Sequence, residues 1–448
     1  MKSVHVATPS PVVARRRRRR PLDAILAVDG QRPTPYTWLV LGYAALFQIR
    51  PWEWVGGMDI LPWERLYALV LIGAIVGLVS TYRTAARLGS ATKAWLGLLG
   101  AITLSWLVSI NMSYGWVKYE QLLKLAIVGI CLVIALRTKA DLRLFVLGWI
   151  AIQFAYQGVS VFEHEVNGRG VFRMGVWRLT GIDETFSGPN DFASTTTLLL
   201  PLVFFALRHE RHRLIRLFLM LEVLLAIYVV VKTASRGGFV LVGLFFLFTL
   251  AMSRHKAMGL VAVATLAASA VLFLPDDIVD RYRTIIDPEA NAQAQESAEG
   301  RIMGLKRGIA IFQQRPILGI GVGCTRVAYT KLSGLPGKDN LELHNVYGQV
   351  LAETGGVGAI AWLVFLAVSI RIFLRVRSRA RRLGDPYLMD FGRVGLEILG
   401  LLLLSGFLGH NLYRYTWLWI AALGDVALAV TARQQRLKAM ARSRATPG

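Results

Sequence analysis

The stretch that decides the fold is LELHNVYGQVLAETGG, Leu341–Gly356, together with the apolar run that continues from it to Leu374. Segment 347–374 is long and apolar enough to cross a membrane as a helix, which takes about 20 largely apolar residues. A histidine and an asparagine, His344 and Asn345, stand directly before it. An imidazole therefore lies where the chain is about to enter lipid. Its role depends on which other residues of the chain lie near it.

The composition is typical of a polytopic membrane protein. Of the 448 residues, 54% are hydrophobic and only 18% are charged, which excludes a disordered chain and an ordinary soluble domain. The net charge of +23 could indicate nucleic-acid binding, but the basic residues occur in short clusters between apolar runs. Membrane topology explains these clusters better, so no nucleic-acid partner is expected.

The hydropathy pattern predicts an all-α protein with about twelve transmembrane helices. The predicted segments are 36–53, 63–80, 92–111, 119–136, 142–161, 191–207, 214–233, 238–252, 257–275, 347–374, 394–410 and 412–430. The first segment is crowded at its end by Arg50, Pro51 and Glu53, and almost nothing separates the last two.

The distribution of lysine and arginine sets the orientation of these helices. Cytoplasmic connections carry an excess of both residues, and every second connection along the chain is basic, as is the C-terminal tail. The N-terminal tail holds the arginine run Arg15–Arg20 without a sustained apolar core or cleavage site, so it is expected to be a retained cytoplasmic tail. Both termini are therefore predicted to be cytoplasmic.

This topology gives the chain a simple organisation. The predicted parts are a basic tail 1–35, transmembrane helices one to nine 36–275, a large external loop 276–346, helices ten to twelve 347–430 and a basic tail 431–448. Connection 162–190 is also long and external. In the large loop, GRIMGLKRGIAIFQQRP (residues 300–316) predicts an amphipathic helix at the membrane surface. Its apolar face consists of Ile302, Leu305, Ile309 and Phe312.

Among the histidines, only His164, His344 and His410 are predicted to face outward. His344, at the start of a membrane helix, could accept a proton near neutral pH. A polar residue that ends a loop at the interface is the alternative, and position alone does not decide between them. His410, which is followed by Asn411 and has Arg414 nearby, is a reserve candidate for the base.

Two arginines depart from the positive-inside pattern. Arg236 lies in KTASRGGF, a short external turn, where a snorkelling anchor is the alternative to a functional role. Arg301 opens the amphipathic helix, where free N–H groups and the helix dipole favour an anion; an exposed surface arginine is the alternative. Together with His344, these residues suit chemistry on a diphosphate-linked substrate, because guanidinium groups bind phosphate oxygens bidentately.

Other motifs point to structure more than to chemistry. The glycines of RPILGIGVGC, Arg315–Cys324, follow no strand of a βαβ unit, so a tight turn or a backbone anion nest is favoured over a nucleotide site. The motif EHE, Glu163–Glu165, could bind a cation, but adjacent residues seldom converge on one metal, and no metal site is expected.

Two further polar positions remain open. Glu353 is an acid within a membrane helix, which makes it a functional candidate, but the glycines that follow it suit a structural pairing with a neighbouring helix equally well. The motif SGPNDF, Ser187–Phe192, is interpreted first as the cap and first turn of a helix. A role for it in a cavity is the alternative.

The chain resembles the O-antigen ligase and O-antigen polymerase superfamily of polytopic glycosyltransferases. The resemblance rests on RIMGLKRGIAIFQQRPILGIGVG and LHNVYGQVLAETGGVG, with ASRGG and SGPNDFA upstream, and covers residues 180–375. It implies that His344 is the essential external histidine and that Arg236 and Arg301 lie near a lipid diphosphate. Asn345, Tyr347 and Glu353 follow the motif with less defined roles.

The resemblance also implies the reaction. The donor would be a glycan on undecaprenyl diphosphate, and the acceptor the lipid A-core or a growing glycan, at the periplasmic face of a bacterial inner membrane. His344 would remove a proton from an acceptor hydroxyl, and Arg236 and Arg301 would stabilise the departing diphosphate. The anomeric centre would invert, without a metal, ATP or another cofactor.

Several functions stay open at this level. A ligase is favoured, as the default activity of the superfamily, over a polymerase of O-antigen or exopolysaccharide and over a ligase that glycosylates proteins. A transporter or flippase of lipid-linked glycans has the same size and helix count. Against it, the sequence has no internal repeat that relates its halves, and few ionisable groups are expected at mid-membrane.

Overall fold

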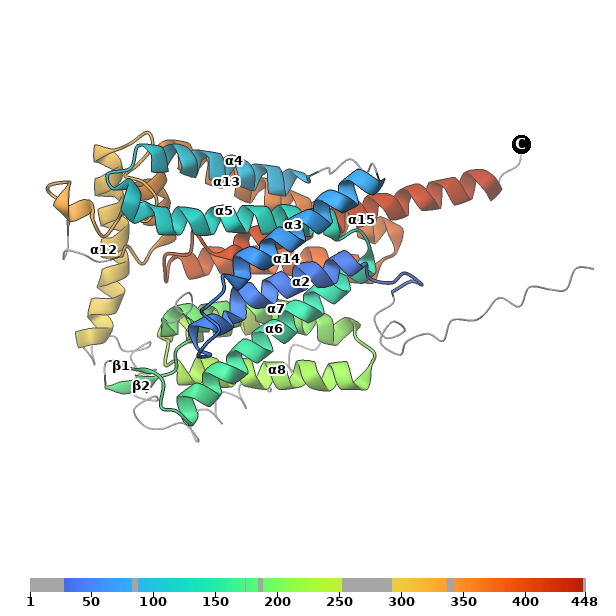
Figure 1. The fold of residues 1–448 in the computed structure, drawn as a ribbon, viewed down its shortest axis with the longest axis horizontal. Coiled ribbons are helices and arrows are strands. Elements are labelled where there is room, and N and C mark those ends of the chain that lie inside the picture. The colour runs from blue at the N-terminus through green and yellow to red at the C-terminus, as the bar shows by residue number, and fades with distance from the viewer. Residues whose placement is uncertain are drawn as a thin grey trace, which may run out of the picture.

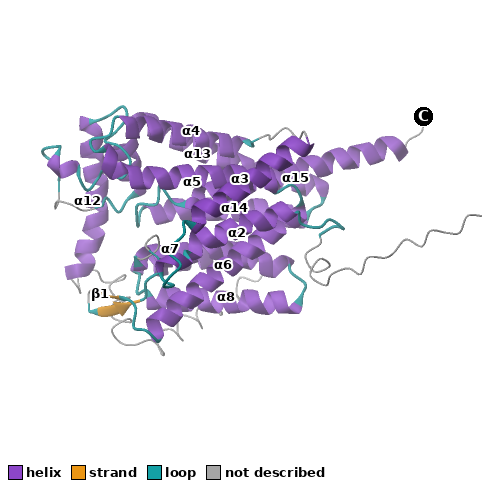
Figure 2. Ribbon diagram, in the orientation of Figure 1, coloured by secondary structure: helices purple, strands orange, loops and turns teal. Residues whose placement is uncertain are grey.

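A computed structural model describes residues 28–82, 88–173, 175–183, 188–251, 292–336 and 342–445. Over these ranges the protein is a bundle of helices with one short β-hairpin (Figures 1 and 2). The elements are α2 (Pro35–Ile49), η1 (Pro51–Glu53), α3 (Trp63–Tyr82), α4 (Ser90–Leu107), α5 (Met112–Ala135), α6 (Lys139–Glu165), β1 (Val171–Arg173), β2 (Val176–Arg178), α7 (Pro189–His209), α8 (Arg213–Lys232), α9 (Arg236–Ala251), α12 (Ala292–Gln314), η3 (Ala328–Thr330), α13 (Val346–Leu383), α14 (Pro386–Gly406) and α15 (Tyr415–Ala445).

The all-α polytopic membrane fold is confirmed. By length and composition, six of the described helices could cross a membrane: α3, α6, α7, α8, α13 and α15, while α9 is a shorter apolar helix. Each predicted segment overlaps a helix of the structure, except 257–275, which lies outside the described residues.

The helix ends differ from the predicted boundaries where charged residues continue a helix. Helix α13 runs to Leu383 and α15 to Ala445, so basic residues expected in a loop and in the tail 431–448 are helical. Lysine and arginine are good helix formers and interact favourably with the negative end of the helix dipole. Gly384, which has a φ of 66°, ends α13. The hairpin β1–β2 in connection 162–190 was not predicted.

The helices run along the bundle, except α12, which crosses one of its ends (Figure 1). The hairpin lies at this same end, while the end of α15 projects from the opposite one. Helix α13 is central, since it packs against α4, α12, α14 and α15. The buried aromatic core includes Trp417 and Trp419 of α15, and the ring of Trp419 lies 5.1 Å from that of Trp149.

Helix α13 is interrupted near its start. Gly355 has φ 62° and ψ −161°, a conformation open in practice to glycine alone. The chain that follows α12 fills this break: the Gly356 amide donates to the Pro316 carbonyl at 2.8 Å, and the Ile320 amide to the Ala352 carbonyl at 2.9 Å. The predicted tight turn at RPILGIGVGC is therefore a backbone connection that fixes the first turns of α13.

Two of the three glycines of α12 bring it close to the start of α13. A Cβ on Gly304 would collide with the Leu343 carbonyl, and one on Gly308 with the backbone of Gly348. The apolar side chains Ile302 and Ile309 are exposed instead, on the part of the helix that faces away from α13. This arrangement agrees with a helix that lies on the membrane surface.

Candidate active site at the α12 end of the bundle

His344 immediately precedes α13 in a strained backbone conformation. Its φ of 46° is in the left-handed region, where residues other than glycine are uncommon. Asn345 caps the helix: its Oδ1 accepts hydrogen bonds from the amides of Tyr347 and Gly348, both at 3.0 Å. The Tyr347 hydroxyl donates to the Leu403 carbonyl of α14 at 3.0 Å. Asn345 and Tyr347 therefore position His344 in this structure.

A second imidazole lies beside His344. His410, in the turn between α14 and α15, places its ring 5.2 Å from the His344 ring, centroid to centroid. The turn is held by Asn411, whose amide nitrogen donates to the Leu402 carbonyl at 2.9 Å and to Ser405 Oγ at 2.7 Å. His410 Nδ1 and Asn411 Oδ1 are both buried without a hydrogen-bond partner.

The two predicted arginines also meet at this place. Arg236 is the first residue of α9, and Arg301 reaches α9 from α12: a Cβ on Gly237 would lie 3.6 Å from a terminal nitrogen of Arg301. Burial, together with the positive charge of Arg236, lowers the pKa of Arg301. Two adjacent guanidinium groups repel each other, so an anion bound between them would be stabilised by both.

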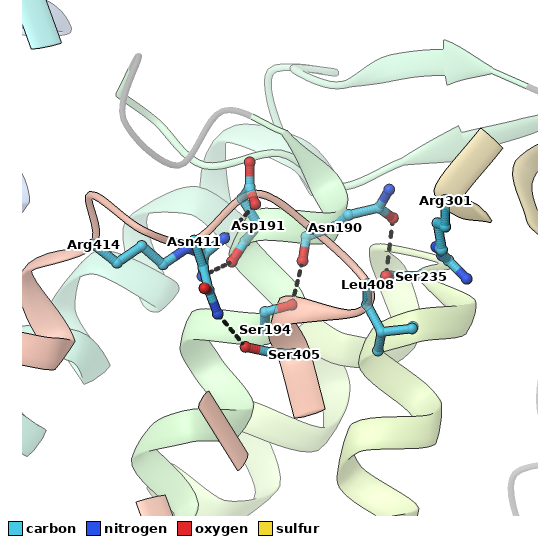
Figure 3. Close-up of a pocket in the computed structure, with 11 residues that line it drawn as sticks. Asn190, Asp191, Ser194, Ser235, Arg301, Ser405, Leu408, Asn411 and Arg414 are labelled. Atoms are coloured by element: carbon cyan, nitrogen blue, oxygen red, sulfur yellow. Dashed lines mark hydrogen bonds and ion pairs between the residues drawn. The ribbon is translucent and has the colours of Figure 1, made fainter. Parts of the chain in front are cut away.

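Arg301 lines a small pocket together with residues of α7 and of the α14–α15 turn (Figure 3). The pocket is lined by Asn190, Asp191, Ser194, Ser235, Gly237, Arg301, Ser405, Leu408, Gly409, Asn411 and Arg414. Its free volume of about 10 Å³ is close to that of one water molecule. A diphosphate or a sugar ring is larger, so in this conformation it can contact the lining only from the open side.

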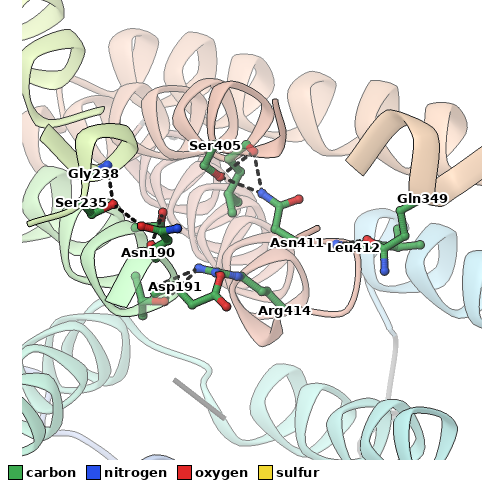
Figure 4. A network of polar contacts seen from close by, with 12 residues as sticks. Asn190, Asp191, Ser235, Gly238, Gln349, Ser405, Asn411, Leu412 and Arg414 are labelled. Carbon is green, nitrogen blue, oxygen red and sulfur yellow. Dashed lines mark hydrogen bonds and ion pairs between the residues drawn. The ribbon is translucent and has the colours of Figure 1, made fainter. Parts of the chain in front are cut away.

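The N-terminal turn of α7 supplies a polar wall of the pocket. Gly188, which has no side chain, is the N-cap of α7. Asn190 and Asp191, in the first turn, line the pocket. Asn190 Oδ1 accepts hydrogen bonds from Arg178 of β2 and from Ser235 Oγ, both at 2.9 Å (Figure 4). Within SGPNDF, Ser187 lies outside the described residues and Pro189 begins the helix, while Asn190 and Asp191 line the cavity, which was the second interpretation.

Arg178 is a residue that the sequence analysis missed. It is only 3% exposed, and its Nε donates to the Thr233 carbonyl at 2.7 Å. The hairpin thereby fixes both Asn190 and the turn that precedes Arg236. No helical periodicity or motif marked this residue, because a two-stranded hairpin in a long loop has no such signal.

Asp191 and Arg414 form an ion pair across the pocket. A second terminal nitrogen of Arg414 donates to Thr195 Oγ1 at 3.0 Å, so the guanidinium bridges α7 and the start of α15. Asp191 also interacts electrostatically with His410 and His344. The signal in the sequence was the proximity of Arg414 to the pair His410 and Asn411, but its carboxylate partner could not be identified.

The surroundings of His344 determine its protonation. One side of the residue is open to solvent, but the protein atoms around the ring desolvate it and lower its pKa to about 4. The positive charges of His410 and Arg301 act in the same direction, while Asp191 and Glu342 act against it. His344 is therefore a neutral imidazole at pH 7, which is the form that can accept a proton.

Glu353, a predicted candidate, and His164, a histidine predicted to face outward, are both buried and hydrogen-bonded to other segments. Glu353 is 1% exposed and accepts hydrogen bonds from the Gly323 amide at 2.9 Å and from the Tyr413 hydroxyl. It ties the glycine turn and the α14–α15 turn to α13, which is the structural alternative for this acid. His164 is buried and its Nδ1 lies 2.9 Å from the Arg169 carbonyl, so it holds the loop before the hairpin.

Buried acids are more frequent in the bundle than the sequence analysis expected. Glu222 of α8 is 0% exposed and accepts a hydrogen bond from Gln157 at 2.9 Å, and Asp425 and Glu397 are also buried. In the part of the chain that the structure describes, no group of three or more His, Cys, Asp or Glu side chains could hold a metal ion. The absence of a metal from the reaction stays a prediction.

Comparison with known proteins gives a match for part of the chain. Residues 221–363 match the family model described as O-antigen ligase. This range contains Arg236, Arg301, His344 and Glu353, while Asp191, His410 and Arg414 lie outside it. Among curated proteins, none matches the sequence. The matched part is similar to the O-antigen ligase family, in a chain whose described helices include six that are long and apolar enough to cross a membrane.

Proposed function

We propose that the protein transfers a glycan from undecaprenyl diphosphate to a sugar hydroxyl of an acceptor, with His344 as the general base. The observation that carries the proposal is the position of Arg301, which lies against Gly237, adjacent to Arg236, and acts electrostatically on His344. An imidazole and two guanidinium groups thus approach one another from α9, α12 and the segment before α13, which supports these roles. The domain match supports a membrane enzyme of this superfamily.

In the proposed reaction, neutral His344 takes the proton of the acceptor hydroxyl while the hydroxyl oxygen attacks the anomeric carbon. The bond from this carbon to the diphosphate oxygen breaks, and the electron pair leaves with the diphosphate. Arg236 and Arg301 stabilise the charge that develops on the leaving group. Attack from the face opposite the leaving group inverts the anomeric centre in a single displacement.

The activated linkage of the donor supplies the driving force, so the proposal requires neither a metal nor ATP. The proposal also includes the orientation in the membrane. The reaction site lies at the α12 end of the bundle, opposite the end from which α15 projects (Figure 1). With both termini in the cytoplasm, as the basic residues indicate, this end faces the periplasm of a bacterial inner membrane.

The transfer reaction can be measured with the purified protein in liposomes that contain lipid-diphosphate-linked glycan and an acceptor. The proposal predicts formation of the glycosylated acceptor and free lipid diphosphate in the presence of EDTA. A strong requirement for added Mg²⁺ would contradict the metal-free scheme. Movement of the lipid-linked glycan across the bilayer without any transfer product would indicate a transporter instead.

Within the superfamily, we propose a ligase that moves a finished polymer onto a lipid A-core acceptor. The polymerase alternative would extend the polymer between two lipid-linked donors. A strain that lacks the protein separates the two: a ligase deletion accumulates long lipid-linked polymer, whereas a polymerase deletion accumulates single lipid-linked repeats. Long glycan that is missing only from proteins would identify a protein-glycosylating ligase.

A further inference from the structure

His410, whose imidazole can accept and donate a proton, lies beside the proposed base and has no role in the reaction described above. The ring of His410 lies 5.2 Å from the ring of His344 at an interplanar angle of 54°. Its Nδ1 is buried and has no hydrogen-bond partner. Hydrogen bonds of Asn411, Leu412 and Tyr413 hold the surrounding turn, so the position of the turn does not explain this imidazole.

The reaction proposed for His344 requires a group that accepts the proton from it, and His410 can be this group. Burial, with the charges of His410 and Arg301, disfavours a proton on His344. Once His344 has taken the hydroxyl proton, its imidazolium is unstable at neutral pH, and the proton must move before the next turnover. A second imidazole, whose ring lies 5.2 Å away, is an acceptor of suitable chemistry.

A fixed carboxylate, Asp191, interacts with His410. Asp191 interacts electrostatically with His410 and, less strongly, with His344. Its own position is fixed by the ion pair with Arg414, whose guanidinium is held by Thr195. A carboxylate fixed near an imidazole stabilises the imidazolium form.

We propose that His410 is a proton-relay residue, which receives the proton from His344 while Asp191 stabilises the resulting imidazolium. The inference rests on the proposed function. In the transfer step, the O–H bond of the acceptor breaks and its proton passes to His344. In the relay step, this N–H bond breaks and a ring nitrogen of His410 takes the same proton, which then passes to water at the open side of the pocket. No oxidant or reductant is involved.

The test measures transfer by full-length His410→Ala in liposomes, with and without added imidazole. We expect kcat to fall by about 10-fold or more and the donor KM to change little, because proton transfer by a side chain contributes about 10²–10⁴-fold to catalysis. Imidazole should restore part of kcat, and the restored rate should vary with the pKa of substituted imidazoles. A solvent isotope effect on kcat should increase in the variant.

The matched control is His209→Gln. His209 lies at the other end of α7, where its Nε2 is 3.0 Å from Asp390 Oδ2. This variant should keep its activity and should not respond to imidazole. If His410→Ala does not yield a monodisperse protein, His410→Gln provides the same measurement with a side chain of similar volume.

The outcomes separate the relay from the proposed function. Full kcat in both His410 variants would overturn the relay, as would a loss of activity with no imidazole rescue and an unchanged pH profile, which indicates a structural role. If His344→Ala stays active, the proposed function itself fails. If His344→Ala is inactive while His410 variants are normal, only the relay fails.

Discussion

Asp191, in the first turn of α7, forms an ion pair with Arg414, which directly precedes α15. The Arg414 side chain is 13% exposed and that of Asp191 38%, so the pair is shielded on one side and open to the pocket on the other. Arg414 also bonds to Thr195. The pair therefore joins two helices at the place where the candidate chemistry occurs.

Replacing Asp191 with Asn is expected to lower both stability and kcat. The change leaves the guanidinium of Arg414 without its carboxylate, and hydrogen bonds to charged groups contribute about 1.5–3 kcal/mol. Thermal unfolding in detergent checks the stability effect. In the double variant Asp191→Asn/Arg414→Gln, the loss should be smaller than the sum of the single losses, because both changes remove the same interaction. Strictly additive losses would contradict this coupling.

Replacing Arg236 or Arg301 with Gln should raise the donor KM and lower kcat. Loss of one group that stabilises developing charge costs about 10²–10³-fold in kcat. Lys331→Ala is the matched control, since Lys331 is an exposed cation in the segment after α12 and is not part of the pocket lining. An equal loss in the control would mean that net charge, rather than these two positions, determines donor binding.

The pH dependence of kcat/KM should show an acid limb near pH 4. The pKa of His344 is lowered from its ordinary value to about 4, so the neutral base is present above this pH and is lost as the pH falls through it. Transfer should therefore stay constant from neutral pH down to about pH 5. Glu342 raises the pKa of His344, so Glu342→Gln should move the limb to lower pH. A wild-type limb near pH 6.5 would contradict the environment described for His344.

Gly355→Ala should destabilise the protein and reduce transfer. The glycine has φ 62° and ψ −161°, and a Cβ there would collide with the Ile317 carbonyl. Such a backbone conformation costs about 1–3 kcal/mol for other residues. Gly400→Ala in α14 is the control, because a Cβ at Gly400 meets nothing within 4 Å. Similar unfolding temperatures for both variants would show that the break in α13 is not constrained in this way.

Hydropathy made the helices predictable from the sequence, because a membrane span needs a long apolar run and few other structures do. It also located His344 at the start of α13, since the transition from LELHN to the apolar run is sharp. The ends of α13 and α15 were predicted less well. Basic residues indicate the side of a membrane but do not stop a helix.

The candidate site was only partly predictable, for a physical reason. His344, Arg236 and Arg301 stood out because each is a charged or titratable residue next to an apolar segment. Asp191 and Arg178 form the rest of the polar network through contacts between segments distant in sequence. Hydropathy and local motifs contain no information on such contacts, so these partners required the structure.

The most direct test of the central claim is glycan transfer by His344→Ala and His344→Gln in liposomes with a lipid-diphosphate-linked donor. We expect a loss of about 10²–10⁴-fold in kcat, the range for a general base, with donor binding retained because Arg236 and Arg301 remain. Near-normal turnover by either variant would contradict the assignment of His344 as the base.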